Sequence, residues 1–203
     1  FDLKSLMRTI LQSHTYQRSS VPLDGNRDEQ RFYSRYYPQR LMAEVLLDAI
    51  SQVAEVPTPF THIGFPGGDR QETKEYPLGT RAIQLHDSAI ESYFLKTFGR
   101  NSRAITCECE RSDEPSMVQV LHVANGDTIN GKLKAKENRV SRLLAAGHSD
   151  AELTEEIFLH CLSRFPTDEE KTRVVELLGQ VEDGDADEKR LVVEDVFWSL
   201  LST

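Results

Sequence analysis

The helical character of this chain is set by residues 149–178, which read SDAELTEEIFLHCLSRFPTDEEKTRVVELL. Ser149 with Glu152, and Thr167 with Glu170, both match the capping box, in which each side chain satisfies an exposed backbone amide of the other residue. Apolar residues follow each box at the spacing of one helical face. This pattern predicts two consecutive amphipathic helices with sharply defined starts.

The same periodicity, followed outward from these two helices, predicts helices along most of the chain. Strand content is expected to be minimal. Before the Gly/Pro-rich stretch of residues 56–85 we expect a helix at residues 3–14 capped by Asp2 and a helix that starts at Pro38 and ends near Glu55. After it we expect a helix that is capped by Asp87 and runs to Phe98, and a helix from Ser112 to the stop signal Asn125-Gly126. Short helices follow Asp127 and precede Gly147, and a last helix follows the acidic linker Glu182 to Glu188.

Residues 56–85 interrupt this pattern with closely spaced prolines and glycines, which predicts a long loop held by its own apolar side chains, Phe60, Ile63, Phe65 and Tyr76. The predicted fold is mostly α: an irregular multi-helix domain of about eight helices with a long Gly/Pro-rich central loop. We expect one domain over residues 1–203. The alternative is a helical core with the long loop at 1–147 and an acidic three-helix part at 148–203.

Composition and charge narrow the classes of partner. The chain has 203 residues and a formal net charge of −9, and its acidic side chains are concentrated after residue 150. A net negative charge repels phosphate backbones and anionic lipid, so we expect no nucleic-acid partner. Apolar runs are far shorter than the ~20 residues of a membrane-spanning helix, so we also expect no membrane insertion.

Arginines and aromatic residues interleave between residues 4 and 40, and this segment holds the candidate interaction residues Arg31, Arg35, Tyr36, Tyr37 and Arg40. Such a mixture can stack on single-stranded nucleic acid, but it can equally pack against itself and cover the edge of a core. Exposed tyrosines, together with the single tryptophan, Trp198, also leave carbohydrate as a candidate ligand.

The chemically unusual turn is Cys107-Glu108-Cys109. Two thiolates are half of a zinc site, which His122 could help to complete; a bond between the two cysteines would close a small, strained and reducible ring. The third interpretation is that both thiols only pack at a helix entry. Cys107, Cys109 and His122 are therefore the candidate redox or metal residues, whereas Cys161 falls on an apolar helical face and is expected to be core.

Several stretches, read together, resemble a known family. They are LQSHTYQRSS at residues 11–20, RYYPQRLMAEVLLDAI at 35–50 and CECERS at 107–112, with Leu121-His122 and Asn125-Gly126. These residues resemble the planctomycete domain-of-unknown-function family 1553, and the resemblance spans nearly the whole chain.

The resemblance implies which domains accompany this one and where the protein is located, but it implies no reaction. Members of that family usually follow a second uncharacterised domain, and often a c-type cytochrome-like domain, in large exported proteins. It thus implies an extracytoplasmic fragment, periplasm-like or at the cell surface. No catalytic residue carries over. Haem is expected only in a companion domain, because this chain lacks Cys-x-x-Cys-His, and we expect no cofactor bound by the chain itself.

The expected function is a non-catalytic helical interaction or structural domain of an exported multidomain protein, with companion domains of the parent chain or another protein as partners. The alternative is an enzyme, or a metal or redox module, centred on the Cys107-Glu108-Cys109 turn.

Overall fold

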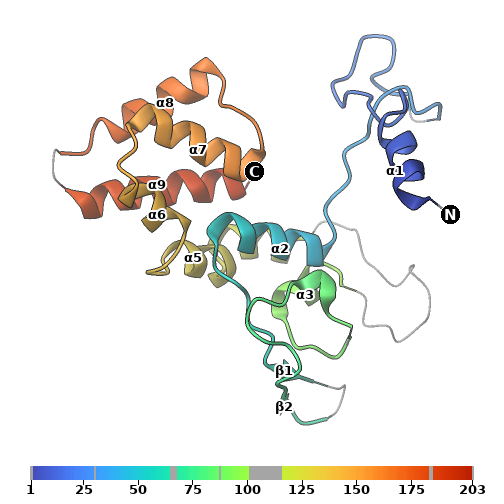
Figure 1. The fold of residues 1–203 in the computed structure, drawn as a ribbon, viewed down its shortest axis with the longest axis horizontal. Coiled ribbons are helices and arrows are strands. Elements are labelled where there is room, and N and C mark those ends of the chain that lie inside the picture. The colour runs from blue at the N-terminus through green and yellow to red at the C-terminus, as the bar shows by residue number, and fades with distance from the viewer. Residues whose placement is uncertain are drawn as a thin grey trace. The chain divides into compact units, whose positions relative to one another are not determined.

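The structure is a computed structural model that describes residues 2–29, 31–64, 68–86, 88–100, 116–182 and 185–202. The chain divides into two compact units, Phe1–Leu41 (unit 1) and Met42–Thr203 (unit 2), which are described separately (Figure 1). The prediction of a single domain over residues 1–203, and the alternative division after residue 147, stay predictions.

Unit 1 contains one helix, α1, at Leu3–Leu11. Its predicted cap is confirmed, because the Asp2 Oδ1 atom accepts a hydrogen bond from the Ser5 amide at 3.0 Å. The helix ends three residues earlier than the predicted residue 14. The Ser13 hydroxyl donates to the Ile10 carbonyl at 2.8 Å, so a side chain occupies a carbonyl at the end of the helix and a turn follows.

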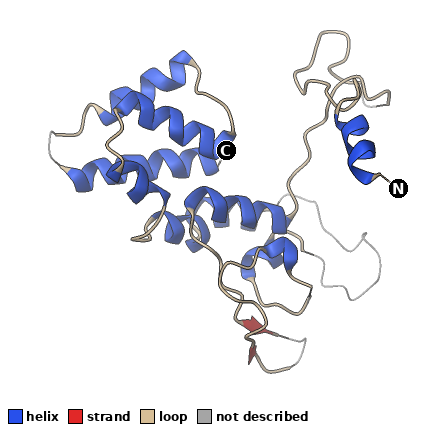
Figure 2. Cartoon of the chain, in the orientation of Figure 1, coloured by secondary structure: helices blue, strands red, loops and turns tan. Residues whose placement is uncertain are grey.

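The first half of unit 2 is built around α2. The Gly/Pro-rich stretch contains two very short antiparallel strands, in which His62 pairs with Glu72, and a 3₁₀ turn (Figure 2). Two of the apolar side chains expected to hold this stretch, Phe60 and Tyr76, are buried. The elements are α2 at Ala43–Ala54, β1 at His62–Ile63, β2 at Gln71–Glu72, η1 at Ala82–Gln84 and α3 at Tyr93–Thr97.

The regular elements of the second half of unit 2, among its described residues, are all helices: α4 at Met117–Asn125, α5 at Asp127–Leu133, α6 at Arg139–Ala145, α7 at Asp150–Leu162, α8 at Asp168–Leu178 and α9 at Ala186–Leu201. Helices α7, α8 and α9 pack against one another, while α5 and α6 each contact both α2 and α9. These two short helices therefore join the two halves of unit 2. The predicted mostly α fold with little strand is confirmed.

One continuous hydrophobic core runs through unit 2. Its most deeply buried large side chains come from helices in both halves of the unit, namely Leu47, Leu95, Ile129, Leu153, Ile157 and Phe197. Cys161 packs against this core, as expected from its place on an apolar face.

The two capping boxes are confirmed: Ser149 and Glu152 exchange hydrogen bonds at the start of α7, and Thr167 and Glu170 do so at the start of α8. The predicted helix start at Pro38 is wrong, because α2 begins at Ala43. Residues 38–42 present no side chain for burial, whereas α2 is held by its buried face from its first residue.

The observed caps of two further predicted helices differ from the predicted ones. Asp87 lies outside the described residues, and the helix expected behind it begins only at Tyr93, where the Ser92 hydroxyl accepts from the Leu95 amide at 3.3 Å. Ser112 also lies outside the described residues, and the cap observed for α4 is Ser116.

Candidate functional site

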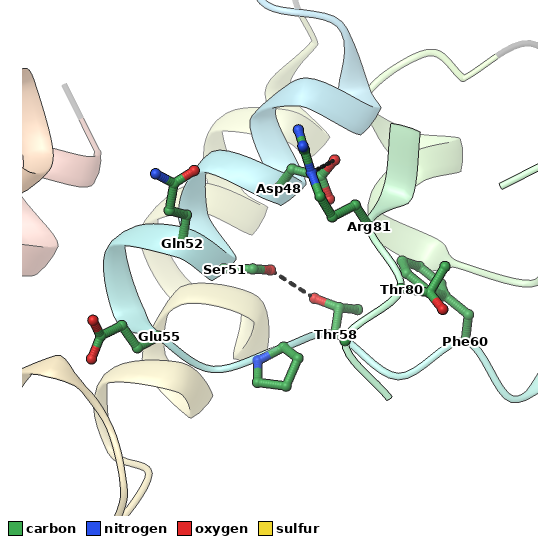
Figure 3. Close-up of a pocket in the computed structure, with 10 residues that line it drawn as sticks. Asp48, Ser51, Gln52, Glu55, Thr58, Phe60, Thr80 and Arg81 are labelled. Atoms are coloured by element: carbon green, nitrogen blue, oxygen red, sulfur yellow. Dashed lines mark hydrogen bonds and ion pairs between the residues drawn. The ribbon is translucent and has the colours of Figure 1, made fainter. Parts of the chain in front are cut away.

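Unit 2 has a cleft beside the C-terminal half of α2, which we call the Asp48 cleft (Figure 3). It has a volume of about 310 Å³, and its lining combines carboxylates, hydroxyls, an amide and a guanidinium: Asp48, Ser51, Gln52, Glu55, Pro57, Thr58, Phe60, Gly79, Thr80 and Arg81.

Internal hydrogen bonds occupy several polar groups of the Asp48 cleft. The Asp48 carboxylate accepts from the Ala82 amide at 2.6 Å and from the Ile83 amide at 3.1 Å, and it lies 3.6 Å from the Arg81 Nε atom. It therefore caps η1 and ties that turn to α2. The lining contains no imidazole or thiol that could act as a base or a nucleophile. The cleft can offer hydrogen bonds to a polar molecule, and its two carboxylates are already engaged, Asp48 by the backbone of η1 and Glu55 by Arg139 and Arg142.

The C-terminus of α2 is held by cations from α5 and α6. Arg139 donates from Nε to the Val53 carbonyl at 2.7 Å and from Nη2 to the Gln52 carbonyl at 3.2 Å, and it pairs with the Glu55 carboxylate at 2.8 Å. The Lys132 ammonium donates to the Val56 carbonyl at 2.6 Å. Cations at this end of a helix satisfy its free carbonyls and complement its dipole, so this cluster organises the fold.

Arg139 also fixes the state of a histidine. Its Nη1 atom lies 2.8 Å from Nε2 of His160, which also lies 3.4 Å from the Glu156 carboxylate. Because a guanidinium can only donate, the contact with Arg139 favours the form of His160 in which Nε2 carries no proton. Burial, followed by the positive charge of Arg139, lowers the pKa of His160 below its usual value. Arg139 and burial thus favour the neutral form of His160, whereas the carboxylates of Glu156 and Glu55 oppose the shift.

Lys132 gives a testable pH dependence. Its side chain is nearly buried, and burial lowers the pKa of its ammonium to about 8. The unfolded chain keeps the ordinary, higher pKa, so between the two values the unfolded state binds more protons and the free energy of unfolding rises with pH. We expect the native chain to gain stability between about pH 8 and about pH 10 relative to Lys132→Met.

Urea denaturation of the two proteins across that range measures the Lys132 effect as a difference. The comparison removes the opposite contribution of Cys161, whose pKa burial raises to about 12, because both proteins share this thiol. Parallel stability curves for the native chain and Lys132→Met would contradict the prediction.

The predicted site residue His122 lies in a second cleft, the His122 cleft, of about 480 Å³. Its ring packs against three aromatic rings, with centroids 5.3 Å from Tyr93, 5.6 Å from Phe94 and 6.1 Å from Phe98. The Nε2 atom lies 2.9 Å from the Thr128 hydroxyl. Burial lowers the pKa of His122 although the nearby carboxylate of Asp127 opposes the shift, so the imidazole is neutral near pH 7.

Gly126 is required beside His122. A Cβ at this position would lie 2.2 Å from the His122 carbonyl and 2.9 Å from its Nδ1 atom, closer than packing allows. The Asn125-Gly126 pair therefore does more than end α4, since it lets the backbone approach the histidine ring.

Cys107 and Cys109 lie outside the described residues, so the metal and redox interpretations of that turn stay predictions. Within the described ranges, no group of three or more His, Cys, Asp or Glu side chains is placed to hold a metal ion. Counting thiols by intact mass, together with elemental analysis of the purified chain, tests both interpretations: three free thiols without stoichiometric metal would contradict each of them.

The candidate interaction residues lie in unit 1, where part of the segment packs on itself. The Arg35 guanidinium sits 4.2 Å from the centroid of the Tyr37 ring and donates to the Arg27 carbonyl at 3.2 Å. Arg31 and Tyr36 remain exposed on the same segment. The fifth candidate residue, Arg40, is also exposed.

The sequence did not single out Arg139, Lys132 or Tyr93, and it marked Asp127 and Asn125 only as the start and the stop of helices. Their places in these clusters arise from contacts between distant parts of the chain, which no local motif indicates.

Comparison with known proteins adds one finding. The family model described as protein of unknown function (DUF1553) matches residues 1–178. No curated protein and no solved structure matches the chain. Among the described residues, no helix combines the length and hydropathy that crossing a membrane demands.

Proposed function

This chain belongs to the DUF1553 family of proteins of unknown function, and we propose that it is a non-catalytic interaction domain of a longer exported protein, which docks onto a companion domain through α1. The observation that carries this proposal is the apolar face of α1. The location outside the cytoplasm rests on the resemblance to exported proteins of this family.

Helix α1 is divided sharply into two faces. Its five large apolar side chains fall on one side of the helix and are 47–63% exposed: Leu3, Leu6, Met7, Ile10 and Leu11. The opposite side carries Lys4, Ser5, Arg8 and Thr9. An amphipathic helix of this kind normally faces a core, so this apolar face is built for burial.

The described residues of unit 1 supply no core that could cover this face. None of its described residues is buried, and every buried apolar side chain belongs to unit 2. Isolated helices shorter than about 12–15 residues are marginal in water, and α1 has nine residues. Full burial of each leucine-sized side chain contributes about 1.5–3 kcal/mol, so docking would stabilise the helix as well as the complex.

The charge of unit 1 indicates the kind of partner surface that would bind α1. In residues 1–41, seven basic side chains stand against four acidic ones, and Lys4 and Arg8 are the charged residues of α1 itself. Cations that border an apolar helix face favour an apolar groove with an acidic rim. We therefore assign as the occupant a companion domain of the parent chain that carries such a groove.

A matched pair of double variants tests the proposal. Leu6→Gln with Met7→Gln places two amides on the apolar face, whereas Ser5→Gln with Thr9→Gln places the same two amides on the polar face. Titration calorimetry of the full chain against each separately produced companion domain is expected to find one binder. The apolar-face variant should weaken that complex at least about tenfold, and the control should not.

Two outcomes would contradict the proposal. The first is that no companion domain binds, or that the apolar-face variant binds as well as its control. The second is a loss of stability in the isolated chain carrying Leu6→Gln and Met7→Gln, because a face that faces water should tolerate polar residues. Urea denaturation of the isolated variant provides that second measurement.

A further inference from the structure

A third cleft, of about 350 Å³, lies on the C-terminal half of unit 2 and contains the only tryptophan of the chain. We call it the Trp198 cleft. Residues from α4, α5 and α9 line it, and Asn125 lines both this cleft and the His122 cleft. The two clefts thus share the last residue of α4.

Each cleft presents an aromatic side chain held in a defined position. Tyr93 is 64% exposed, and its ring packs against the ring of His122 at 5.3 Å. Trp198 is half-buried, and its indole Nε1 donates to the Ala124 carbonyl at 3.2 Å. The contact fixes the indole ring before any ligand arrives, which reduces the entropy lost on binding.

Exposed polar groups lie between and beside these rings. The side chains of Asn125 and Asp195 are exposed and form no hydrogen bond with other described residues. Asp127 is exposed at the edge of the His122 cleft. An amide can both donate and accept, and a carboxylate accepts strongly, so the three side chains suit a ligand rich in hydroxyl groups.

We propose that the His122 and Trp198 clefts together bind an uncharged oligosaccharide of several sugar units. The electron-rich faces of Tyr93 and Trp198 attract the slightly positive C–H groups of sugar rings, while the polar side chains bind the hydroxyls. Both volumes fall in the range of about 300–1,000 Å³ that is usual for ligand pockets.

The charges that line the two clefts disfavour anionic ligands. Asp127 and Asp195 face these clefts, and Lys134 is the single basic residue among the linings. Carboxylates without a cation cluster repel sulfated or uronic glycans, nucleotides and phosphopeptides. The shared residue Asn125 favours a ligand long enough to pass from one cleft to the other over a single sugar that fills one of them.

Trp198 provides a direct readout in the full chain, because all tryptophan fluorescence comes from this cleft. We expect neutral hexasaccharides, such as those of cellulose, xylan and chitin, to include at least one that shifts the emission of Trp198. The monosaccharides of the same series and a galacturonate hexamer should leave the emission unchanged.

Variants separate this site from nonspecific binding. Tyr93→Ala and Asp195→Ala are each expected to weaken the hexasaccharide complex about tenfold in titration calorimetry, whereas Tyr16→Ala removes a tyrosine of unit 1 that is 58% exposed and should not. The proposal is overturned if no neutral hexasaccharide changes the fluorescence, if the galacturonate hexamer binds as well, or if Tyr93→Ala and Tyr16→Ala behave alike.

Discussion

Replacing Arg139 by alanine is expected to lower the free energy of unfolding of unit 2 by about 3–5 kcal/mol. One guanidinium donates to the Val53 and Gln52 carbonyls at 2.7 and 3.2 Å and pairs with Glu55 at 2.8 Å. Truncation leaves these partners near the core without that donor, and the cost of unsatisfied groups exceeds the worth of the lost contacts. Urea denaturation followed by the fluorescence of Trp198 measures the loss.

Arg173→Ala is the matched control. Arg173 pairs with Glu169 one helical turn away, but both side chains are about three-quarters exposed. Such surface pairs contribute little, so the control should change the free energy of unfolding by less than about 0.5 kcal/mol. Equal losses in Arg139→Ala and Arg173→Ala would show that the Arg139 cluster does not hold α2.

The pKa of His160 reports on the same cluster. The positive charge of Arg139 helps to lower it, so Arg139→Ala should raise the pKa that an NMR titration of His160 measures. The lowered pKa of His160 also makes the free energy of unfolding depend on pH. A histidine whose folded pKa lies below its unfolded pKa costs stability as the pH falls below about 6.5, because only the unfolded state gains the proton. Arg139→Ala should weaken this acid sensitivity.

Local sequence signals predicted the parts of the fold that local hydrogen bonds determine. The capping boxes at Ser149 and Thr167, and the cap at Asp2, form as expected because all their atoms lie within three residues of one another. The helix start at Pro38 was wrong because a favourable first residue does not by itself hold a helix. Burial does, and it begins at Ala43.

The contacts that shape the candidate sites join residues far apart in the chain. Arg139 reaches the Val53 carbonyl across 86 residues, and Lys132 reaches that of Val56 across 76. The residues next to Arg139 and Lys132 in the sequence do not indicate which distant carbonyls these two cations bind. The two clefts likewise take Tyr93 and Trp198 from separate helices, and of these two residues the sequence singled out only Trp198.

Phe197→Ala is expected to lower the free energy of unfolding of unit 2 by about 3–5 kcal/mol, the usual cost of emptying a fully buried aromatic site. Phe197 is 0% exposed and belongs to α9, the helix that packs against α5, α6, α7 and α8. A cavity at this position therefore loosens the helices of the second half of unit 2, including α5 and α6, which in turn contact α2 in the first half. Urea denaturation monitored by far-UV circular dichroism measures the change.

Leu191→Ala on the same helix is the control for Phe197→Ala, because Leu191 is 58% exposed. It should cost less than about 0.5 kcal/mol, since alanine also favours the helix. Phe197→Leu should fall between the two, because leucine refills part of the cavity. Were Phe197→Ala no more harmful than Leu191→Ala, α9 would not be the helix on which the core of unit 2 depends. A loss confined to one half of unit 2 would instead show that α5 and α6 do not couple the two halves.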